Sequence, residues 1–182
     1  LDAEGVGVDH VRRVPHCASP CAAILVDPRG ERLICAYTDP RLDREATWLP
    51  LERVDAVDAV LADTRWPEGA AALLDQARAR GKVAVLDGEI GPVPDLLALM
   101  PRATHVVFSA SGLAAACPGN GPGASLRRAA ALTPAFVGVT LGADGFLWLA
   151  GDVEYRVPAL EIVAVDTLAA GDVWHAAFTL AL

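Results

Sequence analysis

From residue 57 onward, short apolar runs of strand length alternate with helix-like segments, and no other feature of the sequence restricts the fold as strongly. The strand-like runs span residues 57–62, 83–86, 105–108, 136–140 and 160–165. Helix-like runs span residues 69–80, 94–100, 112–117, 125–132 and 173–180. Because strands that alternate with helices pair into a mostly parallel sheet covered by helices, the sequence predicts an α/β fold.

Two β-hairpins are also expected. Residues 22–26 and 31–37 have the pattern of antiparallel strands, and Asp27-Pro28-Arg29-Gly30 between them has the Pro and Gly positions of a type I turn. Residues 145–149 and 153–157 form the second pair. Gly119-Asn120-Gly121-Pro122-Gly123 imitates a dinucleotide-binding loop, but no strand directly precedes it and Pro122 lacks an N–H. We interpret it as an ordinary loop.

Composition argues against several classes of function. The net charge of −8 disfavours a nucleic-acid-binding surface. No segment is long and apolar enough to span a membrane, and the first residues lack a signal-peptide pattern, so we expect a cytoplasmic protein. Lys82 is the only lysine, so the P-loop pattern Gly-x-x-x-x-Gly-Lys-Ser/Thr is missing. Nucleotide binding would therefore need another device.

The stretch Asp166-Thr167-Leu168-Ala169-Ala170-Gly171-Asp172 lies where a strand-like run leads into a helix-like run. Backbone N–H groups at a helix start are unpaired and the helix dipole is positive there, so small residues let an anion approach closely. Asp172 is then a candidate base for a hydroxyl that attacks a phosphate. The alternative is a helix-capping role for Asp172. The preceding small residues, together with Asp166 and Thr167, favour the catalytic interpretation.

A second stretch, Val139-Thr140-Leu141-Gly142-Ala143-Asp144-Gly145, allows two interpretations. It is either a strand, turn and strand that needs its glycines for the turn alone, or a place where a nucleotide phosphate lies over Thr140 and Gly142, with Gly145 allowing close approach.

Arg65 follows a strand-like run and also has two interpretations. It either pairs with Asp63 on the surface or donates to an anionic group of a substrate. His175, one turn into the last helix, is expected to pack near the site rather than to be catalytic.

Together, Asp-Thr-x-Ala-Ala-Gly-Asp and the preceding Val-Thr-Leu-Gly-x-x-Gly resemble the motifs of the PfkB (ribokinase-like) family of carbohydrate kinases. Residues 61–66, 85–89 and 108–114 look most like the sulfofructose kinase and ketohexokinase-like branches. The resemblance implies a three-layer α/β/α fold with a mostly parallel sheet and a small β-sheet lid. Residues 1–38 would belong to the lid and its connection. Residues 39–182 would form the nucleotide-binding core, without the family's N-terminal strands and C-terminal helices.

The resemblance also implies ATP-dependent phosphorylation of a hydroxyl on a ketose-like sugar, with Mg²⁺ bridging the ATP phosphates. Asp172 would match the catalytic base, with an anion hole formed by the N–H groups of Ala169, Ala170 and Gly171. Thr140, Gly142 and Gly145 would match nucleotide contacts. Asp166 and Thr167 would match the region that holds a monovalent cation such as K⁺. Dimerisation through the lid sheet is expected.

The sequence departs from the family at one carboxylate. Many relatives have Asn-x-x-Glu where this chain has Ser109-Ala110-Ser111-Gly112, so Asp87 or Glu89 is expected to act on Mg²⁺ through water instead. Two alternatives to a sugar kinase are a pyridoxal or hydroxymethylpyrimidine kinase and a non-catalytic nucleotide- or sugar-sensing module. Relatives of the vitamin-kinase branch usually lack the hairpin at residues 22–37.

Overall fold

The computed structural model describes residues 2–26, 32–164 and 166–182, and the chain forms two compact units, Leu1–Leu49 and Pro50–Leu182. The boundary between the two units falls after residue 49. The division after residue 38 into a lid segment and a nucleotide-binding core remains a prediction.

The first unit contains a 3-10 helix, η1 (Asp2–Glu4), and two antiparallel strands, β1 (Cys21–Val26) and β2 (Arg32–Tyr37). The predicted hairpin strands are therefore confirmed, while the turn predicted at residues 27–30 lies outside the described residues. Every residue of β1 is exposed, including the apolar Leu25 and Val26.

A buried carboxylate orders the chain that follows β2. Asp39 accepts hydrogen bonds from the Arg41 guanidinium, from the Arg41 backbone N–H and from the Ala18 backbone N–H. These bonds hold the pKa of the Asp39 carboxyl well below its usual range. Asp39 therefore ties two parts of this unit together, and we assign it a structural role.

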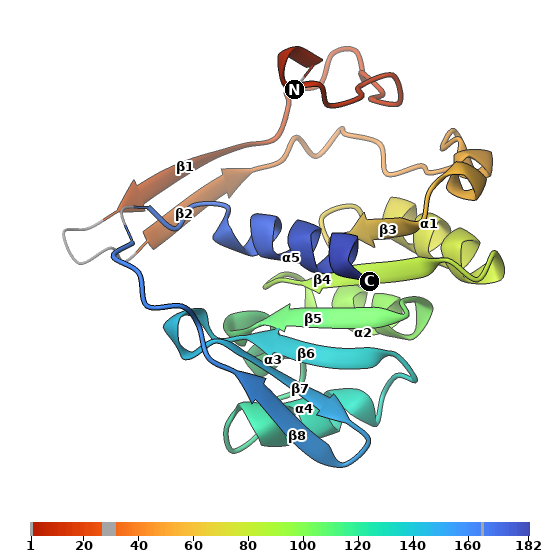
Figure 1. Cartoon of the computed structure of the whole chain (residues 1–182). Helices are drawn as coiled ribbons and strands as arrows, with labels where there is room; N and C mark the ends of the chain where they lie inside the picture. The colour runs from red at the N-terminus through yellow and green to blue at the C-terminus, as the bar shows by residue number, and fades with distance from the viewer. Residues whose placement is uncertain (1, 27–31, 165) are drawn as a thin grey trace. The chain divides into compact units, whose positions relative to one another are not determined.

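The second unit is built on a six-stranded sheet with the strands in sequence order (Figure 1). The strands are β3 (Ala59–Ala62), β4 (Val83–Gly88), β5 (His105–Ser109), β6 (Phe136–Thr140), β7 (Phe146–Ala150) and β8 (Val153–Val157). The first four strands are parallel, and β7 and β8 are antiparallel to their neighbours. The predicted mostly parallel sheet is confirmed.

Helices cover both faces of this sheet. Helices α1 (Pro67–Ala79), α2 (Val93–Leu99), α3 (Ala110–Ala116) and α4 (Pro122–Ala130) lie behind the sheet in Figure 1, and α5 (Ala170–Ala181) lies in front of it. Three short 3-10 helices, η2 (Leu51–Ala56), η3 (Met100–Arg102) and η4 (Gly142–Asp144), join these elements. The result is the expected three-layer arrangement.

Period-two alternation explains the core. Leu86, Val106 and Phe108 belong to the main hydrophobic cluster under the four helices. Val85 and Val107 are also fully buried but lie outside that cluster. Since successive side chains of a strand point to opposite faces, these two valines face α5. Each parallel strand is therefore apolar on both sides, as the sequence pattern indicates.

The strand predicted at residues 160–165 is wrong. Residues 158–164 have no regular secondary structure, and residue 165 lies outside the described residues. Leu160, Ile162 and Val163 are 87%, 78% and 94% exposed. An apolar run becomes a strand only where a neighbouring strand completes its hydrogen-bond ladder, and none pairs with residues 158–164.

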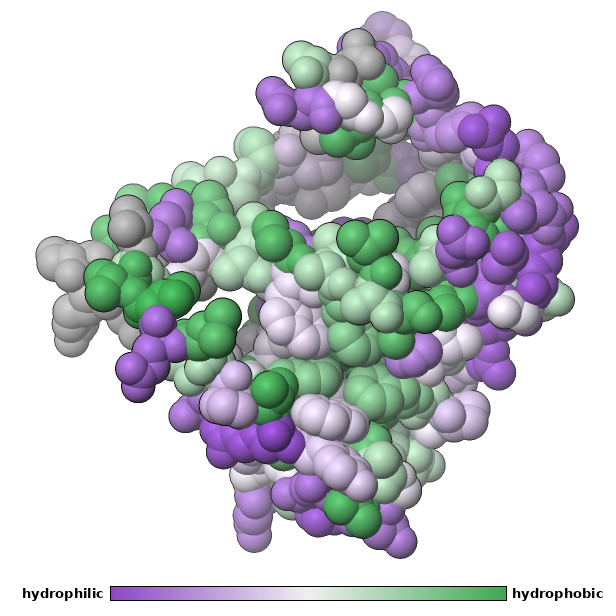
Figure 2. Space-filling view, viewed as in Figure 1, coloured by the Kyte–Doolittle hydropathy of each residue, from purple (hydrophilic) through white to green (hydrophobic). Residues whose placement is uncertain are grey.

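The outward side of α5 is apolar as well. Val173, Leu180 and Leu182 are exposed, and Figure 2 shows hydrophobic side chains gathered over this helix. Its inward side carries the buried His175. Helix α5 therefore meets the sheet through a polar side chain, as well as through aromatic ones.

Candidate active site

Polar side chains gather where the parallel strands end. Asp63 directly follows β3. Asp87 is the last but one residue of β4, Glu89 directly follows that strand, and Ser109 is the last residue of β5. Carboxyl ends of parallel strands lie at one edge of a sheet, which is where open α/β sheets bind ligands. This edge is therefore the candidate active site.

Asp87 shows that α5 contributes to the same edge. Burial raises the pKa of Asp87 to about 6, the attraction of His175 opposes this rise, and the negative charges of Glu89, Asp172 and Asp63 add to it. Charges interact in this way only at short range, so these carboxylates, from the ends of two strands and the start of a helix, share one region.

His175 lies beneath this region. The side chain is buried, its Nε2 is 3.1 Å from the Val107 carbonyl oxygen, and its Nδ1 is 2.8 Å from the Gly171 carbonyl oxygen. The same Nδ1 is 3.4 Å from Asp87 Oδ2. Asp87 Oδ1 is buried and, among the described residues, has no hydrogen-bond partner. Asp87 and His175 therefore form a buried polar pair under the strand ends.

The start of α5 has the geometry that an anion site needs. Ala169, the N-cap residue, is left-handed with φ 57° and makes no side-chain cap bond. The N–H of Ala170 donates to the Thr167 carbonyl at 3.2 Å, so it is used within the turn. The first-turn N–H groups of Gly171 and Asp172 have no acceptor in the helix ladder. A Cβ added at Gly171 would meet nothing within 4 Å, which leaves the approach open.

Asp172 is exposed in this first turn, where its negative charge interacts favourably with the positive end of the helix dipole. The catalytic interpretation fits this position; of the capping alternative, only the favourable interaction with the helix dipole applies, because Ala169 is the N-cap residue and no side-chain cap bond is made. Asp166 Oδ1 accepts the Leu168 N–H at 2.8 Å, so one oxygen of the carboxylate predicted for a cation already orders the loop. Thr167 contributes its carbonyl to the same loop.

In the second predicted motif, two residues have structural roles of their own. The Thr140 hydroxyl donates to the Phe108 carbonyl at 3.3 Å, so it would have to rotate to donate to a phosphate. A Cβ on Gly145 would lie 2.0 Å from the Val157 carbonyl oxygen. Glycine is therefore required there by packing alone. Gly142 has φ +58° and open space around it, so it is the member of this motif with room for a ligand.

Two aromatic rings hold the two motifs side by side. Phe146 follows Gly145, Trp174 lies two residues after Asp172, and their ring centroids are 4.6 Å apart. Such a pair contributes about 0.5–1.5 kcal/mol beyond the area that it buries. Trp174 was not singled out from the sequence, although its spacing from Asp172 on the same helix was visible there.

Glu89 lies against the end of β5. The Ser109 hydroxyl donates to Glu89 Oε1 at 3.2 Å and also accepts the Gly112 N–H at 3.0 Å. A Cβ on Gly112 would lie 2.0 Å from the Gly88 carbonyl oxygen. The backbone of β4 therefore occupies the space that a larger residue at position 112 would need, and the carboxylate beside Ser109 is that of Glu89.

Arg65 lies apart from these contacts. It is exposed in the loop after β3, and its backbone N–H donates to Asp63 Oδ1 at 2.9 Å. The contact that the sequence suggested between the two residues thus involves the Arg65 backbone. Asp63 itself acts on Asp87, which the sequence did not indicate.

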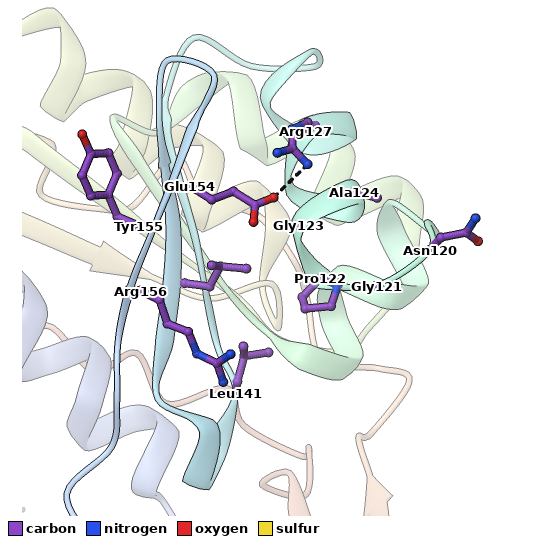
Figure 3. A pocket seen from close by; sticks show the side chains of 11 residues that line it. Asn120, Gly121, Pro122, Gly123, Ala124, Arg127, Leu141, Glu154, Tyr155 and Arg156 are labelled. Atoms are coloured by element: carbon purple, nitrogen blue, oxygen red, sulfur yellow. Dashed lines mark ion pairs between the residues drawn. The ribbon is translucent and has the colours of Figure 1, made fainter.

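A cleft of about 500 Å³ opens beside the site, between the start of α4 and β8 (Figure 3). Glu154 and Arg127 form an ion pair at 2.8 Å across it, and Arg156 donates to the Asp144 carbonyl. Leu141 is its only lining residue from the second predicted motif. Asp172 and His175 do not line this cleft.

Within residues 2–26, 32–164 and 166–182, no three His, Cys, Asp or Glu side chains are grouped closely enough to hold a metal ion directly. Across the same residues, every helix is too short or too polar to cross a bilayer.

The sequence matches a known family of carbohydrate kinases. The family model described as pfkB family carbohydrate kinase matches residues 1–182. Ribokinase of Bacillus subtilis (strain 168) is 27% identical over 190 residues, which cover 100% of this chain and 61% of that protein.

Solved structures agree. A protein of Agrobacterium tumefaciens that is considered to be a ribokinase has a TM-score of 0.84 and 38% identity, over 91% of this chain and 55% of that one. Arabidopsis thaliana ribokinase, complexed with ribose and ATP, has a TM-score of 0.76 over 97% of this chain and 60% of that one. At 20% identity, this second likeness shows the fold alone. The chain thus spans 55% to 61% of the length of these relatives.

Proposed function

The chain belongs to the pfkB family of carbohydrate kinases, and from this premise we propose that it transfers the γ-phosphoryl group of ATP to a hydroxyl of a ketose-like sugar. The observation that carries the proposal is the exposed Asp172 in the first turn of α5, beside the open N–H groups of a small-residue helix start. A base next to an anion site is the pair of groups that phosphoryl transfer requires.

In this proposal Asp172 accepts the proton of the sugar hydroxyl as its oxygen attacks the γ-phosphorus, and ADP leaves. The N–H groups around Ala169, Ala170 and Gly171 stabilise the negative charge of the transferring group, with those of Gly171 and Asp172 best placed. Gly142 supports the nucleotide phosphates, and Thr140 and Gly145 shape the turn beside them. Phosphoryl transfer depends mainly on positioning and charge stabilisation, which backbone groups can provide.

Mg²⁺ would neutralise charge on the ATP phosphates when bound. The carboxylates at the ends of β4 suit a hydrated Mg²⁺, which binds through one or two carboxylates and several waters. Glu89 is half-buried at the strand end, and Asp87 has a buried oxygen without a partner among the described residues. Asp166 and Thr167 would hold a monovalent cation such as K⁺.

The substrate remains a class rather than a compound. Arg65 is exposed after β3, and its guanidinium would bind an anionic group on the sugar. A homodimer formed through β1 and β2, and a cytoplasmic location, are part of the same proposal. The exposed apolar residues of β1 are consistent with a covering partner.

The test is the substitution Asp172→Asn. We expect kcat for ATP-dependent phosphorylation of a panel of ketoses to fall by about 10²–10⁴-fold, because the amide cannot accept the proton. The free energy of unfolding should fall by only about 0.3–1 kcal/mol, since the side chain is exposed and loses only its favourable interaction with the helix dipole.

Asp95→Asn is the matched control, because Asp95 occupies the first turn of α2 and loses the same charge. It should leave kcat unchanged. Full turnover by a folded Asp172→Asn protein would sink the proposal. Turnover of pyridoxal or hydroxymethylpyrimidine alone would assign the chain to a vitamin kinase, and nucleotide binding without any turnover would indicate a sensing module.

A further inference from the structure

His175 is the polar connection between the start of α5 and the sheet. The residue is 2% exposed, and its Nε2 contacts the Val107 carbonyl, which is 68 residues away in the sequence. Its Nδ1 contacts Gly171, the residue before Asp172. The function proposed above assigns no role to this side chain.

We propose that His175 is a positioning residue, which fixes the first turn of α5 on β5 through Val107 and so holds Asp172 and the N–H groups of the anion site in place. This proposal rests on the kinase function proposed above.

The start of α5 needs such a fixed point. Ala169 is held in the left-handed region, which costs an L-residue about 1–2 kcal/mol, and strained residues persist only where their surroundings determine them. Residues 158–164, which lead toward it, are mostly exposed and have no regular structure. The N-cap residue has no side-chain bond. The position of the turn must therefore be set from within α5.

The contacts of His175 also fix the orientation of its ring. Carbonyl oxygens can only accept, and Nδ1 and Nε2 each lie within hydrogen-bond distance of one, with Asp87 Oδ2 3.4 Å from Nδ1. The contact with Gly171 is one turn back on the same helix, so it orients the ring. Of the two carbonyl contacts of the ring, only the one with Val107 crosses to the sheet, so it is the contact through which His175 positions the helix.

Three substitutions of His175 distinguish the effect of the Val107 contact from that of the Gly171 contact. The amide nitrogen of Gln lies near the position of Nε2 and that of Asn near the position of Nδ1, while Leu fills the space without a donor. His175→Leu should lower kcat by about 10–100-fold and change KM for ATP and sugar by less than about threefold, because a misplaced base slows the reaction step more than it weakens binding. His175→Gln should recover more of kcat than His175→Asn.

Several outcomes would overturn the proposal. One is a folded His175→Leu protein whose kcat is within about twofold of the wild-type value. Another is a variant in which KM rises while kcat is unchanged. If the Leu variant does not fold, the Gln and Asn variants decide, and equal kcat values for the two would overturn it.

If the wild-type protein phosphorylates no sugar, the proposed function is wrong. The positioning role of His175 is then tested by the rates of amide hydrogen exchange at the start of α5. Exchange over residues 170–174 should be faster in His175→Asn than in His175→Gln, with α4 unchanged. Equal rates over residues 170–174 would overturn the positioning role as well.

Discussion

At Gly171, the residue type that would stabilise α5 differs from the one that a bound phosphate would need. Its surroundings are open, and its φ lies outside the left-handed region, so the fold itself does not require glycine there. In the function proposed above, the transferring phosphoryl group approaches the backbone here, and a glycine leaves room for it.

Gly171→Ala should therefore have opposite effects on stability and activity. We expect the free energy of unfolding to rise by about 0.5–1 kcal/mol, because alanine is favoured over glycine in a helix. We expect kcat to fall, because the new methyl group occupies the approach of the transferring phosphoryl group. Denaturant unfolding and initial-rate kinetics measure the two effects. Unchanged kcat would show that no phosphate comes close to this residue.

At the scale of elements, the packing of α3 against β4 decides where the site carboxylate lies. The Ser109 hydroxyl caps α3, and the backbone of Gly88 lies directly against Gly112. A backbone oxygen cannot move aside as a flexible side chain can. Position 112 is therefore closed to a larger side chain, and Glu89 on the neighbouring strand end provides a carboxylate beside Ser109.

Gly112→Ala tests this packing, with Gly171→Ala as its matched control. Both substitutions add a methyl group to a helix glycine, but at position 112 the Cβ would lie 2.0 Å from the Gly88 carbonyl oxygen. We expect Gly112→Ala to lower the free energy of unfolding by about 1–3 kcal/mol, as overpacking does, whereas Gly171→Ala raises it. Equal and positive effects in urea unfolding would contradict the close contact.

At the scale of the whole second unit, several elements converge on Asp87. Strand β4 carries it, α5 brings His175 and Asp172, and the ends of β3 and β4 bring Asp63 and Glu89. Burial makes its charged form unfavourable, since an ion loses more hydration than it regains. The pH dependence of stability should therefore report on the assembled site.

The substitution Asp87→Asn tests in which direction Asp87 changes the free energy of unfolding as the pH falls. Burial raises the pKa of Asp87 from 3.8 to about 6, so between these values the folded chain binds a proton that the unfolded chain has lost. The contribution of Asp87 to stability thus increases as the pH falls from about 6 toward 4, and its cost is fully present above pH 6. The free energy of unfolding of the variant minus that of the wild type should decrease from pH 7 to pH 4.

Urea unfolding at pH 7, 6, 5 and 4 measures this difference. Asp152→Asn, which removes an exposed carboxylate in the turn between β7 and β8, is the control. A difference that instead grows as the pH falls would mean that the attraction of His175 outweighs the burial of Asp87.

Local sequence predicted most elements because their signals are contiguous. The sequence predicted all six strands of the large sheet, β3–β8, since each is short and bounded by turn residues. The run at residues 160–164 carried the same signal but has no neighbouring strand, so it forms none. Periodicity reports what a segment can form, while a strand also needs a partner.

The sequence alone determined the α/β class and predicted a helix that starts among small residues beside Asp172, because Gly171 and Asp172 are adjacent in the chain. Only the tertiary structure decided that His175 reaches Val107, that Glu89 meets Ser109 and that Phe146 packs on Trp174. The physical reason is range. Capping and helix dipoles act within one turn, whereas burial, charge coupling and close packing depend on which distant segments the sheet brings together.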